Sequence, residues 1–178
     1  MYEEITERVK GTFLEGKPVF PVSAYTGEGI AELREKLREM VKAAAEKDLR
    51  TPFRLPVDRV FSVDGFGTVV TGTLIEGSVR KDEIAELVPS GLRAKVRSIQ
   101  VHGKDTDTAC AGQRVAMNLA GLKKTDVQRG DTVARPDTVK TSRMLDVRLQ
   151  NLKNSQRTIL TQSQVHFYHG ASVMLAKV

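Results

Sequence analysis

The segment that restricts the fold most is VFSVDGFGTVVTGTLIEG, residues 60–77, which alternates aliphatic with small polar residues and has glycines at 65, 67, 72 and 77. An alternation with a period of two predicts β-strands. Glycine weakens a strand because it has no side chain to pack, so within a strand it marks a turn, a bulge or a close backbone approach. We therefore expect strands joined by tight turns here.

Further strand-like segments follow at short intervals between residues 51 and 139. Phe53, Leu55 and Val57 alternate with polar residues or proline, and the later segments are GTVVTGTLI, IAELVP, LRAKVRSIQV, GQRVAMNLA and DTVARP. Five to seven short strands with no helix between them are typical of a small β-barrel or sandwich. The chain is predicted to be mainly β, with this barrel as its second domain.

The two ends of the chain have different patterns. Residues 1–50 predict a short helix around Ile5 and Val9, a strand in KPVFPVSA, and an amphipathic helix from Ile30, as at the end of an α/β domain. The prolines at 52 and 56 end the helical pattern, so the domain boundary is placed at about residue 50. In residues 140–178 strand-like alternation resumes in SRMLDVRLQNL and TQSQVHFYHGASVMLAKV, which we interpret as the incomplete start of a third domain.

Charge is distributed unevenly along the chain. Of the 28 basic and 22 acidic side chains, residues 1–50 have nine and ten, and residues 51–178 have the remaining 19 and 12. A basic barrel beside a near-neutral segment favours a polyanionic partner such as nucleic acid, although solvated surface charge explains many such values equally well. With one cysteine, Cys110, and no apolar run near the roughly 18 residues of a membrane span, we expect a soluble, cytoplasmic protein. We also expect it to be a monomer.

The loop in VSAYTGEGIAEL places Ser23 and Ala24 at the end of the predicted strand, where open α/β sheets bind ligands. An ordinary strand-to-helix turn would have the same pattern. The sequence has neither a phosphate-binding GxxxxGK(S/T) nor an NKxD-like segment, so nothing would hold the phosphates or Mg²⁺ of a nucleotide. We therefore predict no catalytic residues and no GTP hydrolysis by these 178 residues alone.

The hairpin GFGTVVTG resembles the GxGxVVxG hairpin that opens the second domain of elongation factor Tu-like translational GTPases. The segments PFRLPVDRVFSVDGFGTVVTGT, LRAKVRSIQVHGKD, AGQRVAMNLAG and VHFYHG, together with GTFLEGKPVFPVSAYTGEGIAEL, are similar to the selenocysteine-specific elongation factors of that group. The resemblance implies that residues 1–50 end a GTPase domain, that residues 51–139 form the domain 2 β-barrel, and that residues 140–178 begin domain 3.

The resemblance also implies which residues make contacts. Ser23 and Ala24 would touch the guanine base, and the hairpin that supports the aminoacyl-tRNA end would include Gly65, Gly67, Thr68 and Gly72. GTP and Mg²⁺ would be cofactors of the full-length family and not of this chain alone.

The resemblance assigns the amino-acid pocket to Asp58, Arg59 and Arg114. A selenol is more acidic than a thiol, so it is largely an anion at neutral pH, and two guanidinium groups would favour it over a seryl hydroxyl. Asp58 would orient an arginine or the amino group of the amino acid. Adjacent strand residues point to opposite faces, so Asp58 and Arg59 can share a pocket only if the strand bends or bulges there.

The function that the resemblance implies is binding of selenocysteinyl-tRNA and its delivery to the ribosome, with the selenoprotein mRNA hairpin read by a region outside this chain. Two alternatives stay open: a piece of another elongation factor Tu-like GTPase, or a stand-alone β-barrel interaction module. His102 and the pair His166 and His169 could suggest a metal site. Two histidines three residues apart with no acidic or cysteine partner nearby are more often surface or packing residues, so no metal site is predicted. The sequence departs from the family at Lys81-Asp82, where a Gly-Asp turn is usual, and this puts the local hairpin geometry in question.

Overall fold

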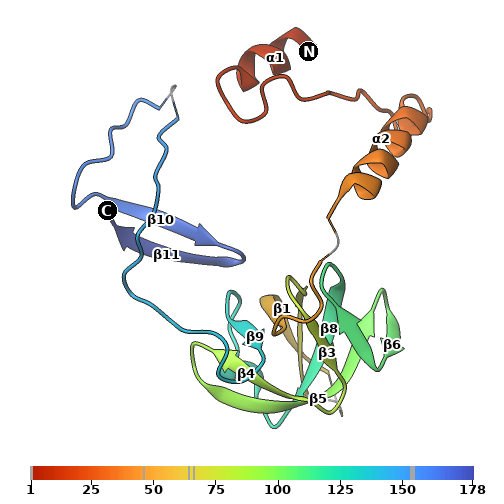
Figure 1. Ribbon diagram of the computed structural model, residues 1–178, viewed down its shortest axis with the longest axis vertical. Helices are drawn as coiled ribbons and strands as arrows, with labels where there is room; N and C mark the ends of the chain where they lie inside the picture. Colours follow the sequence, from red (N-terminus) through yellow and green to blue (C-terminus); the bar gives the residue numbers. More distant parts are fainter. Residues whose placement is uncertain (1, 46, 64, 66, 153–154) are drawn as a thin grey trace. The chain divides into compact units, whose positions relative to one another are not determined.

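The computed structural model of the protein describes residues 2–45, 47–63, 65, 67–152 and 155–178. The chain divides into two units, one of residues 1–46 with 148–159 and the other of residues 47–147 with 160–178. The first unit holds both described α-helices, and the second holds the described strands (Figure 1).

The two helices of the first unit are where the sequence predicts them, as α1 (Tyr2–Val9) and α2 (Ile30–Ala43). Glu32 in the first turn of α2 and Lys42 in its last turn complement the helix dipole. The strand predicted over residues 17–24 is wrong, because no strand is assigned there. A strand needs a neighbour to pair its backbone N–H and C=O groups, and the described residues of this unit form no other strand.

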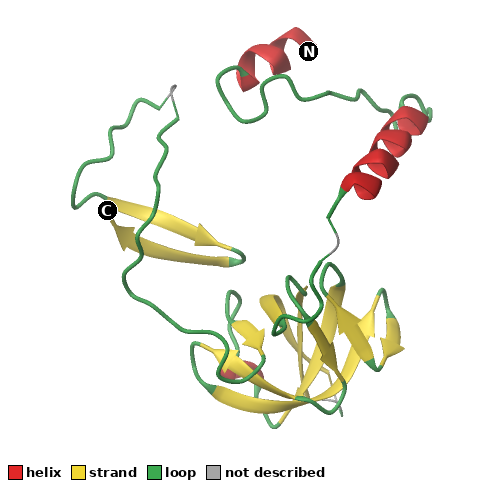
Figure 2. Ribbon diagram, viewed as in Figure 1, coloured by secondary structure: helices red, strands yellow, loops and turns green. Residues whose placement is uncertain are grey.

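Six strands close a β-barrel in the second unit (Figure 2). They follow the order β4-β9-β1-β2-β8-β5, and β5 pairs with β4 to complete the ring. These are the strands that the alternating segments predict: β1 (Arg54–Val63), β2 (Gly67–Thr73), β4 (Ile84–Val88), β5 (Leu92–Val101), β8 (Arg114–Ala120) and β9 (Thr132–Ala134). All of their pairings are antiparallel.

Shorter elements complete the barrel. β6 (Lys104–Thr106) pairs with the end of β5, and β3 (Ser78–Arg80) pairs with β7 (Thr108–Cys110). A single 3₁₀ turn, η1 (Lys124–Asp126), follows β8. β3, β6 and β7 are not predicted from the sequence, because three residues are too few to establish an alternation.

Aliphatic side chains fill the barrel, since every second residue of a strand points inward. Burial of each contributes about 1.5–3 kcal/mol to folding. The largest fully buried side chains are Phe53, Leu55, Val57, Val70, Leu74, Val79, Leu87, Val96, Ile99, Val115, Met117 and Leu119.

The glycines of residues 60–77 have separate roles. Gly65 and Gly67 take positive φ angles of 77° and 91°, which a turn between β1 and β2 can require. Gly72 lies directly across from Val57, where β2 approaches β1 closely. Gly77 also has a positive φ, and its close neighbour is the backbone at Thr51 and Phe53. The close approaches at Gly72 and Gly77 are therefore contacts with the protein's own first strand and the residues just before it.

The described part of residues 140–178 contains one hairpin, β10 (Gln164–His169) paired with β11 (Ser172–Lys177). This confirms the strand pattern of the final segment. The strand expected in SRMLDVRLQNL, residues 142–152, is wrong, because no strand is assigned there. Leu145, Val147 and Leu149 are exposed, so in the described chain this apolar alternation has no partner strand to pack against.

Candidate functional site

A β-bulge in β1 brings Asp58 and Arg59 to the same side of the barrel wall. Val57 pairs with Gly72 and Arg59 pairs with Thr71, so Asp58 is an extra residue with no partner on β2. The core-facing residues on either side, Val57 and Val60, are consequently three positions apart instead of two. Asp58 and Arg59 therefore both lie on the outer side, which is the bulge that a shared pocket requires.

Asp58 binds Arg114, which lies 56 residues further along the chain on β8. Arg114 Nη2 donates to Asp58 Oδ1 at 2.8 Å, and Arg114 Nη1 donates to Asp58 Oδ2, so the pair is bidentate. Thr71 Oγ1, on the strand between them, donates to Asp58 Oδ1 at 3.0 Å. Both side chains remain partly open to solvent, at 29% exposed for Asp58 and 49% for Arg114.

These contacts fix the charges of the site. The hydrogen bond from Arg114 lowers the pKa of Asp58 against the opposing effect of burial, and Thr71 and the charges of Arg114 and Arg59 lower it further. The same hydrogen bond raises the pKa of Arg114. At neutral pH the outer face therefore presents one carboxylate and two guanidinium groups, with Arg59 exposed beside the pair.

A small cavity of about 160 Å³ opens beside Arg114. Its lining includes Thr71, Gln100 and His102. His102 and Gly103 form the two-residue turn between β5 and β6 with φ angles of 52° and 74°, and this turn places the histidine at the cavity. The lining of the small cavity thus includes one cation and several hydrogen-bonding side chains.

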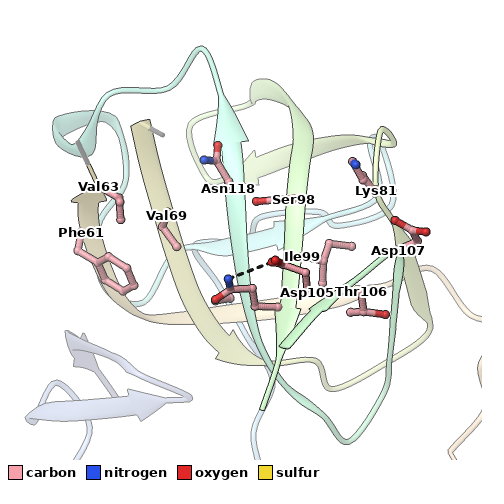
Figure 3. A pocket seen from close by; sticks show the side chains of 12 residues that line it. Phe61, Val63, Val69, Lys81, Ser98, Ile99, Asp105, Thr106, Asp107 and Asn118 are labelled. Carbon is pink, nitrogen blue, oxygen red and sulfur yellow. Dashed lines mark hydrogen bonds between the residues drawn. The ribbon is translucent and has the colours of Figure 1, made fainter. Parts of the chain in front are cut away.

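A larger cavity of about 650 Å³ adjoins the small one, since Gln100 and Ala116 line both. Figure 3 shows Phe61, Val63 and Val69 along one side of it and Asp105, Thr106 and Asp107 along the other. Gln100 Nε2 donates to Asp105 Oδ1 at 3.0 Å, which orients the amide in the cavity. One wall is apolar and the opposite wall is rich in hydrogen-bonding groups.

The remaining predicted site residues lie elsewhere. Thr68 is buried, and its hydroxyl donates to the carbonyl of Leu122 at 2.6 Å, so it ties β2 to the end of β8 from inside the barrel. Neither Gly65, Gly67 nor Gly72 lines a described cavity. Their part in the structure is the turn and the close packing of the hairpin.

Ser23 and Ala24 lie in a compact turn of the first unit. The N–H of Ser23 donates to the Glu28 carbonyl at 3.0 Å, and Ser23 Oγ accepts from the N–H of Thr26 at 3.2 Å. Ala24 is exposed. The Ser23 side chain is thus used within its own loop, while Ala24 is open to solvent.

The sequence reasoning missed Thr71 and the larger cavity. Thr71 is one of several threonines in a strand, and only the pairing of β1 with β2 shows that it reaches Asp58. A signal for the cavity was available, because Phe61, Val63 and Val69 are apolar residues on the face of the hairpin that does not point into the core.

Comparisons with known proteins agree with this fold. Residues 67–134 match the family described as elongation factor Tu domain 2. The chain is 45% identical over its whole length to the selenocysteine-specific elongation factor of Desulfomicrobium baculatum, of which it covers 28%. It is 34% identical, over 99% of its length, to that of Escherichia coli strain K12, again covering 28%.

Solved structures are also similar. Translation elongation factor SelB from Methanococcus maripaludis, in complex with the GTP analogue GppNHp, aligns with a TM-score of 0.81 at 25% identity, over 98% of this chain and 39% of that one. The apo form aligns with a TM-score of 0.78 at 26% identity, over 99% and 38%.

The closed barrel matches elongation factor Tu domain 2 over residues 67–134. Over nearly its whole length, the chain is similar to part of the selenocysteine-specific elongation factors. It spans about 28% of the length of the first curated relatives that it matches.

Two features are absent from the described residues. These residues contain no group of three or more His, Cys, Asp or Glu side chains that could hold a metal ion. Neither described helix is long and apolar enough to cross a membrane.

Proposed function

We propose that this chain supplies the aminoacyl-tRNA-binding part of a selenocysteine-specific elongation factor. The factor would bind selenocysteinyl-tRNA with GTP and deliver it to the ribosome for incorporation of selenocysteine. The observation that supports this most directly is the bidentate pair of Asp58 and Arg114 beside Arg59 on the outer face of the barrel.

The charge of this site suits a single anion. One carboxylate and two guanidinium groups leave a formal excess of one positive charge, which a selenolate would neutralise. A seryl hydroxyl would leave that charge uncompensated. Because these side chains are partly open to solvent, the proposed preference rests on charge-assisted hydrogen bonds, which a selenolate accepts more strongly than a neutral hydroxyl.

The larger cavity suits the nucleotide that bears the amino acid. Phe61 offers an aromatic ring at an apolar wall, and the opposite wall supplies hydrogen-bonding groups to the edge of a base. The two cavities share Gln100 and Ala116 in their linings. A terminal base in the large cavity and the aminoacyl group attached to the same nucleotide in the small cavity could therefore be bound together. The two cavities together match the end of an aminoacyl-tRNA.

The other parts of the proposal rest on the family. GTP and Mg²⁺ would be bound by a complete GTPase domain, with the Ser23-Ala24 loop at the guanine base. The ribosome would be a partner, and the selenoprotein mRNA hairpin would be bound by a region outside these residues. We propose that the factor acts as a cytoplasmic monomer.

The test is discrimination between selenocysteinyl-tRNA and seryl-tRNA by the protein expressed from the full reading frame that contains these residues. Replacement of Arg114 by alanine is expected to reduce the preference by roughly 10- to 100-fold, since a charged hydrogen bond is lost. The control is Arg80→Ala, an exposed arginine of β3 that lines neither cavity, which should change both affinities together.

Three results would count against the proposal. An unchanged preference in the Arg114 variant would reject the pocket. A wild-type preference for bulk elongator aminoacyl-tRNAs would indicate a general elongation factor. Binding to a neutral protein without dependence on salt, and without RNA affinity, would indicate an interaction module, because phosphate contacts make binding steeply salt-dependent.

A further inference from the structure

Thr71 lies between the two charged residues of the site, Asp58 and Arg114. It lies in β2, between β1 with Asp58 and β8 with Arg114, and it pairs directly with Arg59. Its hydroxyl donates to the same Asp58 oxygen, Oδ1, that accepts from Arg114 Nη2. It also lines the small cavity next to Arg114.

The three side chains differ in stiffness. Threonine is β-branched and has few χ1 rotamers, aspartate is short, and arginine is long and flexible. Asp58 stands in a bulge with no partner on β2, so the ladder does not orient it as it orients its neighbours. The hydroxyl of Thr71 therefore has a well-defined position and orients the Asp58 carboxylate. Asp58 in turn orients the guanidinium group of Arg114, whose side chain is half exposed.

We propose that Thr71 is a positioning residue for amino-acid specificity, acting through Asp58 to hold the Arg114 guanidinium at the small cavity. This inference rests on the proposed function. It predicts that Thr71 affects the preference for the anionic amino acid more than the affinity for tRNA as such, because Thr71 would orient the cation that distinguishes a selenolate from a hydroxyl.

The variants separate the hydroxyl from the shape of the side chain. Thr71→Val keeps the volume and branching but removes the donor, and Thr71→Ser keeps the donor. The matched control is Thr108→Val, an exposed threonine of β7 that lines neither cavity. Thermal unfolding of each variant checks that the barrel remains folded.

The first measurement is competition between selenocysteinyl-tRNA and seryl-tRNA for the protein from the full reading frame. Thr71→Val is expected to reduce the preference about tenfold with little change in seryl-tRNA affinity. Thr71→Ser should restore most of the preference, and Thr108→Val should leave it intact. In an Asp58→Asn background, Thr71→Val should have less than about a twofold effect, because the residue it acts through is altered.

The second measurement does not use tRNA. A ¹³C titration of the Asp58 carboxyl should show a higher pKa in Thr71→Val than in the wild type, with Arg114 and Arg59 still facing it. Thr71→Ser should return the pKa to its wild-type position. A pKa that is the same in all three proteins would overturn the positioning role.

The outcomes distinguish this inference from the proposed function. If the wild type prefers selenocysteinyl-tRNA and Arg114→Ala loses that preference while Thr71→Val keeps it, only the role of Thr71 is overturned. Equal impairment of Thr71→Val and Thr71→Ser would show that side-chain shape matters and not the hydroxyl, and would also overturn it. No preference in the wild type would reject both proposals.

Discussion

Gly72 lies so close to β1 that a Cβ added to it would be 2.1 Å from the carbonyl oxygen of Pro56. No real Cβ approaches a backbone oxygen so closely, and the oxygen belongs to a strand that cannot shift by itself. The glycine is therefore required by the spacing of β1 and β2, whatever binds outside the barrel.

Replacement of Gly72 by alanine is expected to destabilise the protein by about 3 kcal/mol, because the two strands must separate to admit the methyl group. Urea unfolding would measure this as a lower midpoint. Gly91→Ala is the control: Gly91 has a φ of 75° and open space around its Cβ position, so only the conformational cost of about 1 kcal/mol applies. A Gly72 variant as stable as the Gly91 variant would show that the strands can yield.

The Asp58–Arg114 pair is expected to make stability depend on pH. The pKa of Asp58 is lowered in the folded protein, so its contribution is fully present above the unfolded value of about 3.9. The contribution is lost as the pH falls through the folded pKa. The difference in unfolding free energy between the wild type and Asp58→Asn should therefore be constant near pH 7 and shrink below about pH 4.

Chemical unfolding of both proteins at a series of pH values would measure this difference. Arg114→Gln supplies the comparison, because without the guanidinium the same replacement of Asp58 should have a smaller pH-dependent effect. A difference that persists unchanged to pH 2 would mean that the pair does not lower the Asp58 pKa.

Phe61 is expected to affect affinity without affecting preference. It lines the larger cavity, and its side chain is only partly covered, so Phe61→Ala should leave the fold intact. Loss of base stacking should weaken selenocysteinyl- and seryl-tRNA binding equally, by about tenfold or more. Equilibrium binding measurements with each tRNA would give the two affinities. The matched control is Phe13→Ala, because Phe13 is 84% exposed. A selective loss of one tRNA would place the amino acid in the larger cavity instead.

Lys81-Asp82 stands where the family usually has a Gly-Asp turn, so Lys81 takes the place of the glycine. Lys81 is not among the residues with a positive φ, so this turn does not require a glycine at that position. Asp82 has a φ of 71°, which aspartate tolerates better than most residues. Its N–H donates to the Val96 carbonyl at 2.8 Å, and its carboxylate pairs with Lys95 at 2.7 Å.

We expect Asp82→Gly to leave the unfolding free energy nearly unchanged, because relief of the backbone conformation offsets the loss of an exposed ion pair. Asp82→Val should cost about 2 kcal/mol, since a β-branched residue is poorly accommodated at positive φ. Denaturant midpoints of the two variants compare them directly. Equal stability of the two would mean that the turn changes its conformation.

The barrel could be predicted from sequence because its longer strands alternate over enough residues to fix which face is buried. Phe53, Leu55 and Val57 show this for β1. The three-residue strands could not be predicted, and neither could the absence of strands at residues 17–24 and 142–152, where the local pattern is strand-like but no partner strand is present. Strand formation depends on pairing, which a local pattern does not contain.

The site could be predicted only in part. Asp58 and Arg114 are 56 residues apart, so their spacing in the sequence does not indicate that they are in contact. Both residues were suggested by the resemblance to a family. The requirement for a bulge followed from strand geometry alone, and the register shift between Val57 and Arg59 confirms it. Thr71 depends on pairing and rotamer, so no reasoning from the sequence by itself would have selected it.

The chain enters and leaves the barrel at neighbouring points. Phe53 precedes β1 and Arg135 follows β9, and the N–H of Arg135 donates to the Phe53 carbonyl at 3.3 Å, beside the pairing of Arg54 with Ala134. A pulling force applied through the two flanking segments would load the β1–β9 pair from one end, so its hydrogen bonds would break one after another. We therefore expect the barrel to resist force in this direction only weakly. We also expect that a short linker could join the two ends while new chain ends are opened in another loop.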